Sequence, residues 1–357
     1  MTTLSMKKHI AVLPGDGVGP EVTKEAVNVL QKIAATYDHE FLFTEALIGA
    51  IAIDKTGNPF PEETEELCKK SDAILFGAIG DPRFDNDPKA KVRPEQGLLA
   101  MRKALGLYAN IRPIFTFENL TFKSPLKEEI IKGVDFVVIR ELTGGIYFGE
   151  PRGRSDGGTR AFDTSVYTKE EILRVSKFAF DLAMKRKKHV TMVDKANVLE
   201  TSRLWRETVQ EFSKTYPEVI VEYMFVDNAS MQLVKRPSAF DVVLTENMFG
   251  DILTDEASVI TGSLGMLPSA SIGQKTALYE PIHGSYPKAA GQNTANPVGS
   301  ILSAALLLEY SFGMIKEAGH IRDAVSRVLA EGRGTKDVVD ANPLSTSEFG
   351  SAVVKAI

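Results

Sequence analysis

The chain has 357 residues, and its 42 Lys or Arg against 47 Asp or Glu give a formal net charge of −5. This length allows one large domain or two, and the acidic balance argues against nucleic acid or an anionic membrane as the main partner. The single cysteine excludes an internal disulfide. No apolar run reaches the roughly 20 residues that span a bilayer. These features predict a cytoplasmic protein that acts on a small molecule.

Short apolar strands alternate with longer helical patterns in the first part of the chain, which predicts an α/β fold. His9–Leu13 and Ala73–Phe76 are predicted strands, and Pro20–Ala35 is a predicted helix. Pro20 suits the first turn of that helix because a proline there gives up no helical hydrogen bond.

The segment GDGVGPE joins the first predicted strand to the first predicted helix. Gly15, Gly17 and Gly19 resemble a dinucleotide fingerprint, but Pro20 stands where its third glycine belongs. A tight strand-to-helix turn also explains these glycines. Any nucleotide bound here would not be held in the Rossmann manner.

Later strands are predicted to end in polar residues, which is where ligands bind in open α/β sheets. These strands are His189–Val193 before Asp194 and Lys195, Val219–Val226 before Asp227, and Asp241–Leu244 before the helix of Asp251 and Asp255. A further strand, Asp135–Arg140, leads into TGGIYFGEPRG. The glycines and aromatics of that segment predict a turn or a projecting β arm.

Three carboxylates gather in the second half of the chain. Asp251 and Asp255 are four residues apart on a predicted helix, so their oxygens can face one point, and Asp227 can join them. Like charges repel unless a cation lies between them, and oxygen ligands without His or Cys select Mg²⁺ or Mn²⁺. An acidic helix N-terminus that complements the macrodipole is the alternative.

Arg102, Arg112 and Arg140 form a complementary set of cations. Guanidinium groups bind carboxylates bidentately, so three arginines suit a di- or tricarboxylate. Lys195 follows an apolar strand. Neighbouring cations would lower its pKa, which would make it a usable base. Tyr147 can donate a proton. Each of these side chains, taken singly, is more typical of a solvated or packing residue.

A mixed stripe lies in residues 94–113, PEQGLLAMRKALGLYANIRP. Glu95, Leu98, Leu99 and Arg102 recur at i, i+3, i+4 and i+7, so a helix aligns them on one face. Two leucines between an acid and an arginine suit a ligand that is part apolar and part anionic. The alternative is a buried leucine pair with charged residues solvated at its edges.

The late segment YEPIHGSYPKAAGQNTANP is a glycine-rich loop that contains His283 and Asn296. Backbone amides of such a loop can cradle phosphates, and His283 can contact an adenosine group. A loop histidine without a ligand is the alternative.

Seven segments occur in the order found in one known family: AVLPGDGVGPEV, PEQGLLAMRKALGLYANIRP, RELTGGIYFGEPRG, VDKANVLE, FGDILTDEAS, GSLGMLPSASIG and EPIHGSYP. The chain resembles the isopropylmalate dehydrogenases, members of the β-decarboxylating dehydrogenases that include isocitrate and tartrate dehydrogenases. The resemblance implies a two-domain, non-Rossmann α/β fold. Residues 1–107 with 262–357 would bind the cofactor, and residues 108–261 would bind substrate and metal, form the dimer and carry the β arm.

The resemblance also implies an activity, the NAD-dependent oxidative decarboxylation of 3-isopropylmalate to 4-methyl-2-oxopentanoate and CO₂ in leucine biosynthesis. Substrate would bind to Glu95, Leu98, Leu99, Arg102, Arg112 and Arg140, and Mg²⁺ or Mn²⁺ to Asp227, Asp251 and Asp255. Lys195, Tyr147 and Asp227 would be catalytic, and NAD would bind at Val18, Glu280, His283, Gly284, Ala295, Asn296 and Asp337. The active sites of a homodimer would be shared, with Lys195 and Asp227 supplied by the other subunit.

One departure concerns the cofactor, because NAD-dependent members commonly have a ribose-binding acid where this chain has Lys288. NADP-dependent isocitrate dehydrogenases carry a lysine followed by a tyrosine, but here Ala289 follows, so NAD is the prediction. Isocitrate, homoisocitrate, tartrate or malate remain alternative substrates, although Leu98 and Leu99 favour an isopropyl group over a third carboxylate. A catalytically silent regulatory subunit is a further alternative, yet no base or metal ligand is missing.

Overall fold

In the computed structural model, which describes residues 5–85 and 92–357, the chain forms two units that each contain a sheet. Unit 1 comprises Met1–Leu107 and Ser263–Ile357, and unit 2 comprises Tyr108–Gly262. Strands alternate with helices in both units, so the predicted α/β fold is confirmed. The assignment of cofactor binding to one unit and substrate binding to the other stays a prediction.

The sheet of unit 1 has the strand order β2-β1-β3-β12-β11. Its strands are β1 (Lys7–Gly15), β2 (Glu40–Glu45), β3 (Ala73–Ala78), β11 (Pro268–Ile272) and β12 (Ala277–Pro281). Neighbouring strands are parallel except for β11 and β12. Every residue of β3 is buried, as expected of an apolar strand in a sheet covered on both faces.

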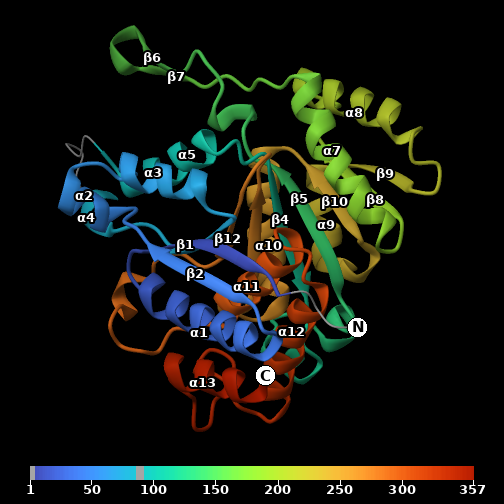
Figure 1. The fold of residues 1–357 in the computed structure, drawn as a ribbon. Helices are drawn as coiled ribbons and strands as arrows, with labels where there is room; N and C mark the ends of the chain where they lie inside the picture. The colour runs from blue at the N-terminus through green and yellow to red at the C-terminus, as the bar shows by residue number, and fades with distance from the viewer. Residues whose placement is uncertain (1–4, 86–91) are drawn as a thin grey trace. The chain divides into compact units, whose positions relative to one another are not determined.

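Unit 1 has eight α-helices in the described part of the chain (Figure 1). They are α1 (Gly19–Tyr37), α2 (Ala50–Thr56), α3 (Glu62–Lys70), α4 (Pro82–Asp85), α5 (Pro94–Ala104), α11 (Val298–Tyr310), α12 (Ile315–Ala330) and α13 (Thr346–Ala356). Helix α11 packs on β3, β11 and β12 and against α1 and α12. Because it is enclosed on all sides, its sequence is apolar around almost the whole circumference.

The sheet of unit 2 has the order β4-β5-β10-β8-β9, antiparallel between β4 and β5 and otherwise parallel. Its strands are β4 (Ala109–Phe115), β5 (Asp135–Glu141), β8 (His189–Asp194), β9 (Ile220–Phe225) and β10 (Val242–Thr245). Its helices are α6 (Glu128–Ile131), α7 (Lys169–Met184), α8 (Glu200–Ser213), α9 (Val226–Lys235) and α10 (Asn247–Ser258). Asp227 therefore lies in the first turn of α9, because β9 ends before the predicted limit at Val226.

A two-stranded arm, β6 (Gly153–Ser155) with β7 (Arg160–Phe162), stands apart from the main sheet of unit 2 (Figure 1). Nearly all of its side chains are exposed, as predicted for a projecting β arm. Tyr147 is not on the arm but in a 3₁₀ helix, η2 (Gly145–Tyr147), that precedes it. Among the described residues, no helix has the length and apolar character needed to cross a membrane.

Candidate active site

Arg112 and Arg140 lie on adjacent antiparallel strands, β4 and β5, on the same face of the sheet. Arg140 is directly opposite Asn110, two residues from Arg112, and side chains two residues apart on a strand share a face. The Arg112 Nε donates to Asn110 Oδ1 at 2.9 Å, which orients the guanidinium. The strand pairing therefore brings two of the three predicted carboxylate-binding arginines together.

Asp251 and Asp255 face these arginines from α10. Arg112 donates to Asp255 Oδ1 at 3.1 Å and lies 3.9 Å from Asp251 Oδ1, while Arg140 donates to Asp251 Oδ1. Both carboxylates thus converge on one guanidinium, as the i, i+4 spacing predicts. Neither lies in the first turn of α10, so the macrodipole alternative is wrong.

Gly250 allows α10 to approach β5 this closely. A Cβ atom at Gly250 would lie 2.6 Å from Arg140 Cγ, which is shorter than any tolerable contact. The Arg140 guanidinium is buried and donates twice to Asn247 Oδ1, at 2.8 and 3.0 Å. These contacts fix Arg140 in one orientation, which favours a binding role over a solvated one.

Tyr147 joins the same cluster through its hydroxyl, which donates to Asp251 Oδ2 at 2.9 Å. Burial and the neighbouring Asp251 charge raise the pKa of Tyr147, so the phenol keeps its proton at neutral pH. The turn that presents it is fixed by the buried Glu141, which accepts from the backbone N–H groups of Thr143 and Gly144, both at 2.8 Å. The structure therefore presents Tyr147 as a hydrogen-bond donor with a fixed position.

Lys195 and Asp227 form a second pair in unit 2, with 2.5 Å between Lys195 Nζ and Asp227 Oδ1. The hydrogen bond from Lys195 lowers the pKa of the Asp227 carboxyl. Among the described residues of one chain, no group of three or more His, Cys, Asp or Glu side chains could hold a metal ion. Asp227 is therefore not assembled with Asp251 and Asp255 within a single chain, and the shared site of a dimer stays a prediction.

Part of the stripe of α5 is exposed at the surface of unit 1. The buried face of this helix is Pro94, Gly97 and Met101, and Gly97 is needed because a Cβ there would lie 2.6 Å from the Pro59 carbonyl oxygen. Glu95 and Leu99 are exposed and Leu98 is half-buried. The alternative of a buried leucine pair is thus wrong, and the two leucines offer an apolar surface.

Arg102, the last member of the stripe, lies 3.6 Å from Glu280 Oε1 on β12, and both side chains are mostly buried. Glu280 was predicted to bind the cofactor, but it does not line the pocket that the other predicted cofactor residues share. Its contact with Arg102 instead connects it to the α5 stripe.

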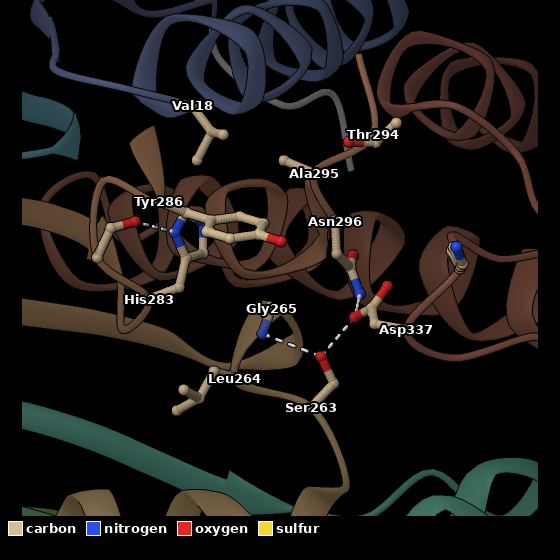
Figure 2. A pocket seen from close by; sticks show the side chains of 12 residues that line it. Val18, Ser263, Leu264, Gly265, His283, Tyr286, Thr294, Ala295, Asn296 and Asp337 are labelled. Atoms are coloured by element: carbon tan, nitrogen blue, oxygen red, sulfur yellow. Dashed lines mark hydrogen bonds between the residues drawn. The ribbon is translucent and has the colours of Figure 1, made fainter. Parts of the chain in front are cut away.

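The pocket in unit 1 has a volume of about 700 Å³. Six of the seven predicted cofactor residues line it: Val18, His283, Gly284, Ala295, Asn296 and Asp337. Six further lining residues were not predicted: Ser263, Leu264, Gly265, Tyr286, Thr294 and Lys336 (Figure 2). The structure brings together segments from the start, the middle and the end of unit 1 around one space.

Hydrogen bonds fix the polar wall of this pocket. Asp337 accepts from Asn296 Nδ2 at 2.8 Å and from Ser263 Oγ (Figure 2). It also accepts from Thr335 Oγ1 at 2.5 Å. His283 lies elsewhere on the wall, and burial lowers its pKa, so its imidazole is neutral. Its Nδ1 lies 2.9 Å from the Gly284 carbonyl oxygen and donates to it, which leaves Nε2 as an enclosed acceptor without a partner.

The GDGVGPE turn forms one edge of this pocket. Gly15 and Gly17 have positive φ angles of 71° and 58°, and a Cβ at Gly17 would lie 1.9 Å from the Ser285 carbonyl oxygen. That oxygen accepts from the Val18 N–H at 2.8 Å. The tight-turn interpretation of the glycines is confirmed.

Several residues that support the site were not predicted. Asn110, Asn247 and Thr254 orient the arginines, and Arg206 holds Asp194 next to Lys195 through two hydrogen bonds of 2.8 Å. Asn110 is the one with a sequence signal, because its i, i+2 spacing from Arg112 places both on one strand face.

The sequence model of the isocitrate/isopropylmalate dehydrogenase family matches residues 9–353. The 3-isopropylmalate dehydrogenases of Priestia megaterium and Bacteroides fragilis are each 55% identical to this chain and cover 99% of it, with 96% and 99% of their own lengths matched. The chain belongs to the isocitrate/isopropylmalate dehydrogenase family. The family predicted from the seven motifs is thus confirmed.

Solved structures of the family are similar in fold. An isocitrate dehydrogenase from Methylococcus capsulatus is 33% identical, with a TM-score of 0.87 and coverage of 98% of this chain and 99% of that one. A β-decarboxylating dehydrogenase from Thermococcus kodakarensis is 35% identical, with a TM-score of 0.81 and coverage of 98% and 96%.

Proposed function

We propose that this protein catalyses the NAD-dependent oxidative decarboxylation of 3-isopropylmalate to 4-methyl-2-oxopentanoate and CO₂, with Mg²⁺ or Mn²⁺ as the metal. The full-length 55% identity to proteins that carry the name 3-isopropylmalate dehydrogenase supports this substrate over the others. The exposed Leu99 and the half-buried Leu98 agree with it, since burying an isopropyl group there contributes about 1–3 kcal/mol.

Arg112 and Arg140 bind the carboxylates of the substrate in this proposal. Both are held by neighbouring side-chain oxygens before any ligand arrives, so little side-chain entropy is lost when the ligand binds. Arg102 on α5 adds a third guanidinium, and Glu95 on the same helix repels the extra carboxylate of isocitrate.

Asp251 and Asp255 fit a divalent cation because their carboxylates converge and are all-oxygen ligands. Asp227 of a second subunit would complete the set. A bound cation supplies Lewis acidity to the oxygens of the substrate.

Lys195 and Tyr147 carry out the two proton transfers of the proposed reaction. Lys195, paired with Asp227, takes the proton of the substrate hydroxyl as its carbon is oxidised. Tyr147, which keeps its proton at neutral pH, supplies the proton that completes the ketone after CO₂ leaves.

The pocket of unit 1 fits NAD, which accepts the hydride when it is bound. The enclosed Nε2 of His283 and the fixed carboxylate of Asp337 offer acceptors to the adenosine half. Lys288 does not line the pocket. Lys336 does, but it lies beside the Asp337 carboxylate, which would repel the phosphate that distinguishes NADP.

A homodimer is part of the proposal because unit 2 exposes apolar side chains on packed helices. Met231 and Val234 on α9, and Ile252 on α10, are 55%, 44% and 58% exposed. Exposed apolar patches of this kind mark contact surfaces. A second copy that covers them would bring its own Lys195 and Asp227.

The test measures NADH formation from NAD with 3-isopropylmalate, isocitrate or malate in the presence of Mg²⁺. We expect kcat/KM to be at least about tenfold higher for 3-isopropylmalate. Activity should disappear on chelation and in Lys195→Met. A folded dimer that forms no NADH would instead support a regulatory subunit, and a higher kcat/KM with NADP would refute the choice of cofactor.

A further inference from the structure

The pocket of unit 1 has one aromatic wall. Of the lining residues that the structure describes, Tyr286 alone carries a Phe, Tyr or Trp ring, while most of the others are small or polar. Tyr286 as a residue is 61% exposed, which is unusual for an aromatic residue without a partner surface. Figure 2 shows the Tyr286 ring on the same side of the pocket as His283 and away from Asp337.

Backbone contacts fix the loop that presents this ring. The residue before it, Ser285, accepts from the Val18 N–H at 2.8 Å, and the Tyr286 carbonyl oxygen itself accepts from the Ala289 N–H at 3.0 Å. Further along, the Gly291 N–H donates to Glu21 Oε1 on α1 at 2.5 Å. The ring is therefore exposed, but the loop that carries it is held by hydrogen bonds on both sides of Tyr286.

The backbone at Tyr286 is strained, with φ 39° and ψ 62° in the left-handed region. A bulky side chain rarely adopts this conformation, and it persists only where the surroundings enforce it. Such residues concentrate at ligand-binding sites. An exposed aromatic side chain on a strained backbone, at the wall of a pocket, points to a role in holding a ligand.

We propose that the Tyr286 ring packs face to face against the adenine ring of the dinucleotide, an inference that rests on the proposed function. Adenine offers a flat π face for stacking and an exocyclic amine that can donate a hydrogen bond. The pocket supplies both complements, the Tyr286 ring and the unpartnered His283 Nε2 acceptor. The hydroxyl of Tyr286 is not needed for this contact, whereas the ring is.

Calorimetry with AMP as the probe tests the inference without turnover. We expect Tyr286→Ala to raise the Kd for AMP by roughly tenfold, within the range for loss of one base–aromatic stack. Tyr286→Phe, the matched control that keeps the ring, should bind AMP as the unchanged protein does. Equal AMP affinity in all three proteins would overturn the proposal.

A second measurement uses the unchanged protein and so does not depend on the variants folding. Nitration of Tyr286, mapped by mass spectrometry, should be slowed by AMP and not by nicotinamide mononucleotide. Protection by nicotinamide mononucleotide alone would overturn the proposal. If AMP protects Tyr286 but 3-isopropylmalate is not oxidised, the proposed function fails while the adenine contact stands.

Discussion

Arg206 on α8 should contribute more to the stability of unit 2 than any of its exposed ion pairs. It makes two hydrogen bonds of 2.8 Å to Asp194, whose side chain is only 2% exposed. In Arg206→Met the carboxylate of Asp194 would stay buried and keep the Ala196 N–H, at 3.0 Å, as a hydrogen-bond donor. The free energy of unfolding should therefore fall.

The size of this loss follows from the burial of the pair. Unit charges about 4 Å apart attract by about 4 kcal/mol at an effective dielectric constant of about 20. Removing one partner of a buried pair costs about 3–5 kcal/mol. Because the Arg206 side chain is 26% exposed, solvent screens part of the interaction, and we expect about 3 kcal/mol.

Trp205 makes the measurement specific to unit 2. It is the only tryptophan of the chain, is buried beside Arg206, and lies 5.4 Å from the Tyr167 ring in an edge-to-face contact. Its fluorescence in a urea titration reports the unfolding of this unit. The matched control is Arg203→Met on the same helix, which removes an ion pair with Glu200, 85% exposed, and a hydrogen bond to the Ala196 carbonyl oxygen. It should cost only about 1–2 kcal/mol.

Two results would refute this reasoning. Equal losses in Arg206→Met and Arg203→Met would show that burial of the pair does not matter. The double variant Asp194→Asn with Arg206→Met removes the buried charge, so it should be more stable than Arg206→Met alone. Equal stability of the double and the single variant would assign the loss to side-chain packing.

Three further predictions concern other parts of the chain. Burial raises the pKa of Cys68 to about 12, so a thiol reagent at mildly alkaline pH should label it only after unfolding, and rapid labelling of the native protein would contradict this. Burial raises the pKa of Glu246 from 4.5 to about 7, so its contribution to stability is complete below the lower value and is lost as pH rises through the higher one. Glu246→Gln should flatten this fall in unfolding free energy, and an unchanged slope would disprove the assignment. Leu98→Asn or Leu99→Asn should raise KM for 3-isopropylmalate and leave KM for malate nearly unchanged, whereas equal increases would remove these residues from the apolar subsite.

Helix α5 shows what the sequence could and could not predict about the fold. The i, i+3, i+4, i+7 spacing correctly predicts a helix over residues 95–102. It does not identify the core face, because Pro94 and Gly97 look no more buried in the sequence than two leucines. Contact with Pro59 selects the core face, because Gly97 lets α5 approach the Pro59 backbone. Leu99 is then exposed and Leu98 half-buried.

The candidate site was predictable in its charged residues but not in their partners. Arg140 and Asn247 are 107 residues apart in sequence, and no local pattern links them. The same holds for Tyr286, whose exposure and positive φ depend on a loop held by contacts with α1. Charged side chains at strand ends carry a sequence signal, whereas supporting hydrogen bonds arise from tertiary packing.

The arginines and aspartates were predicted as two separate sets, one for substrate and one for metal, yet the structure pairs them with each other. Arg112 contacts Asp251 and Asp255, and Arg140 contacts Asp251. A dicarboxylate that binds alone would have to displace these aspartates from the arginines. A divalent cation that binds alone would take the aspartates and leave the arginines without their carboxylate partners. Arriving together, the two ligands restore a partner to every charge. Each should therefore increase the affinity for the other by the same factor, because coupling between two binding sites is reciprocal.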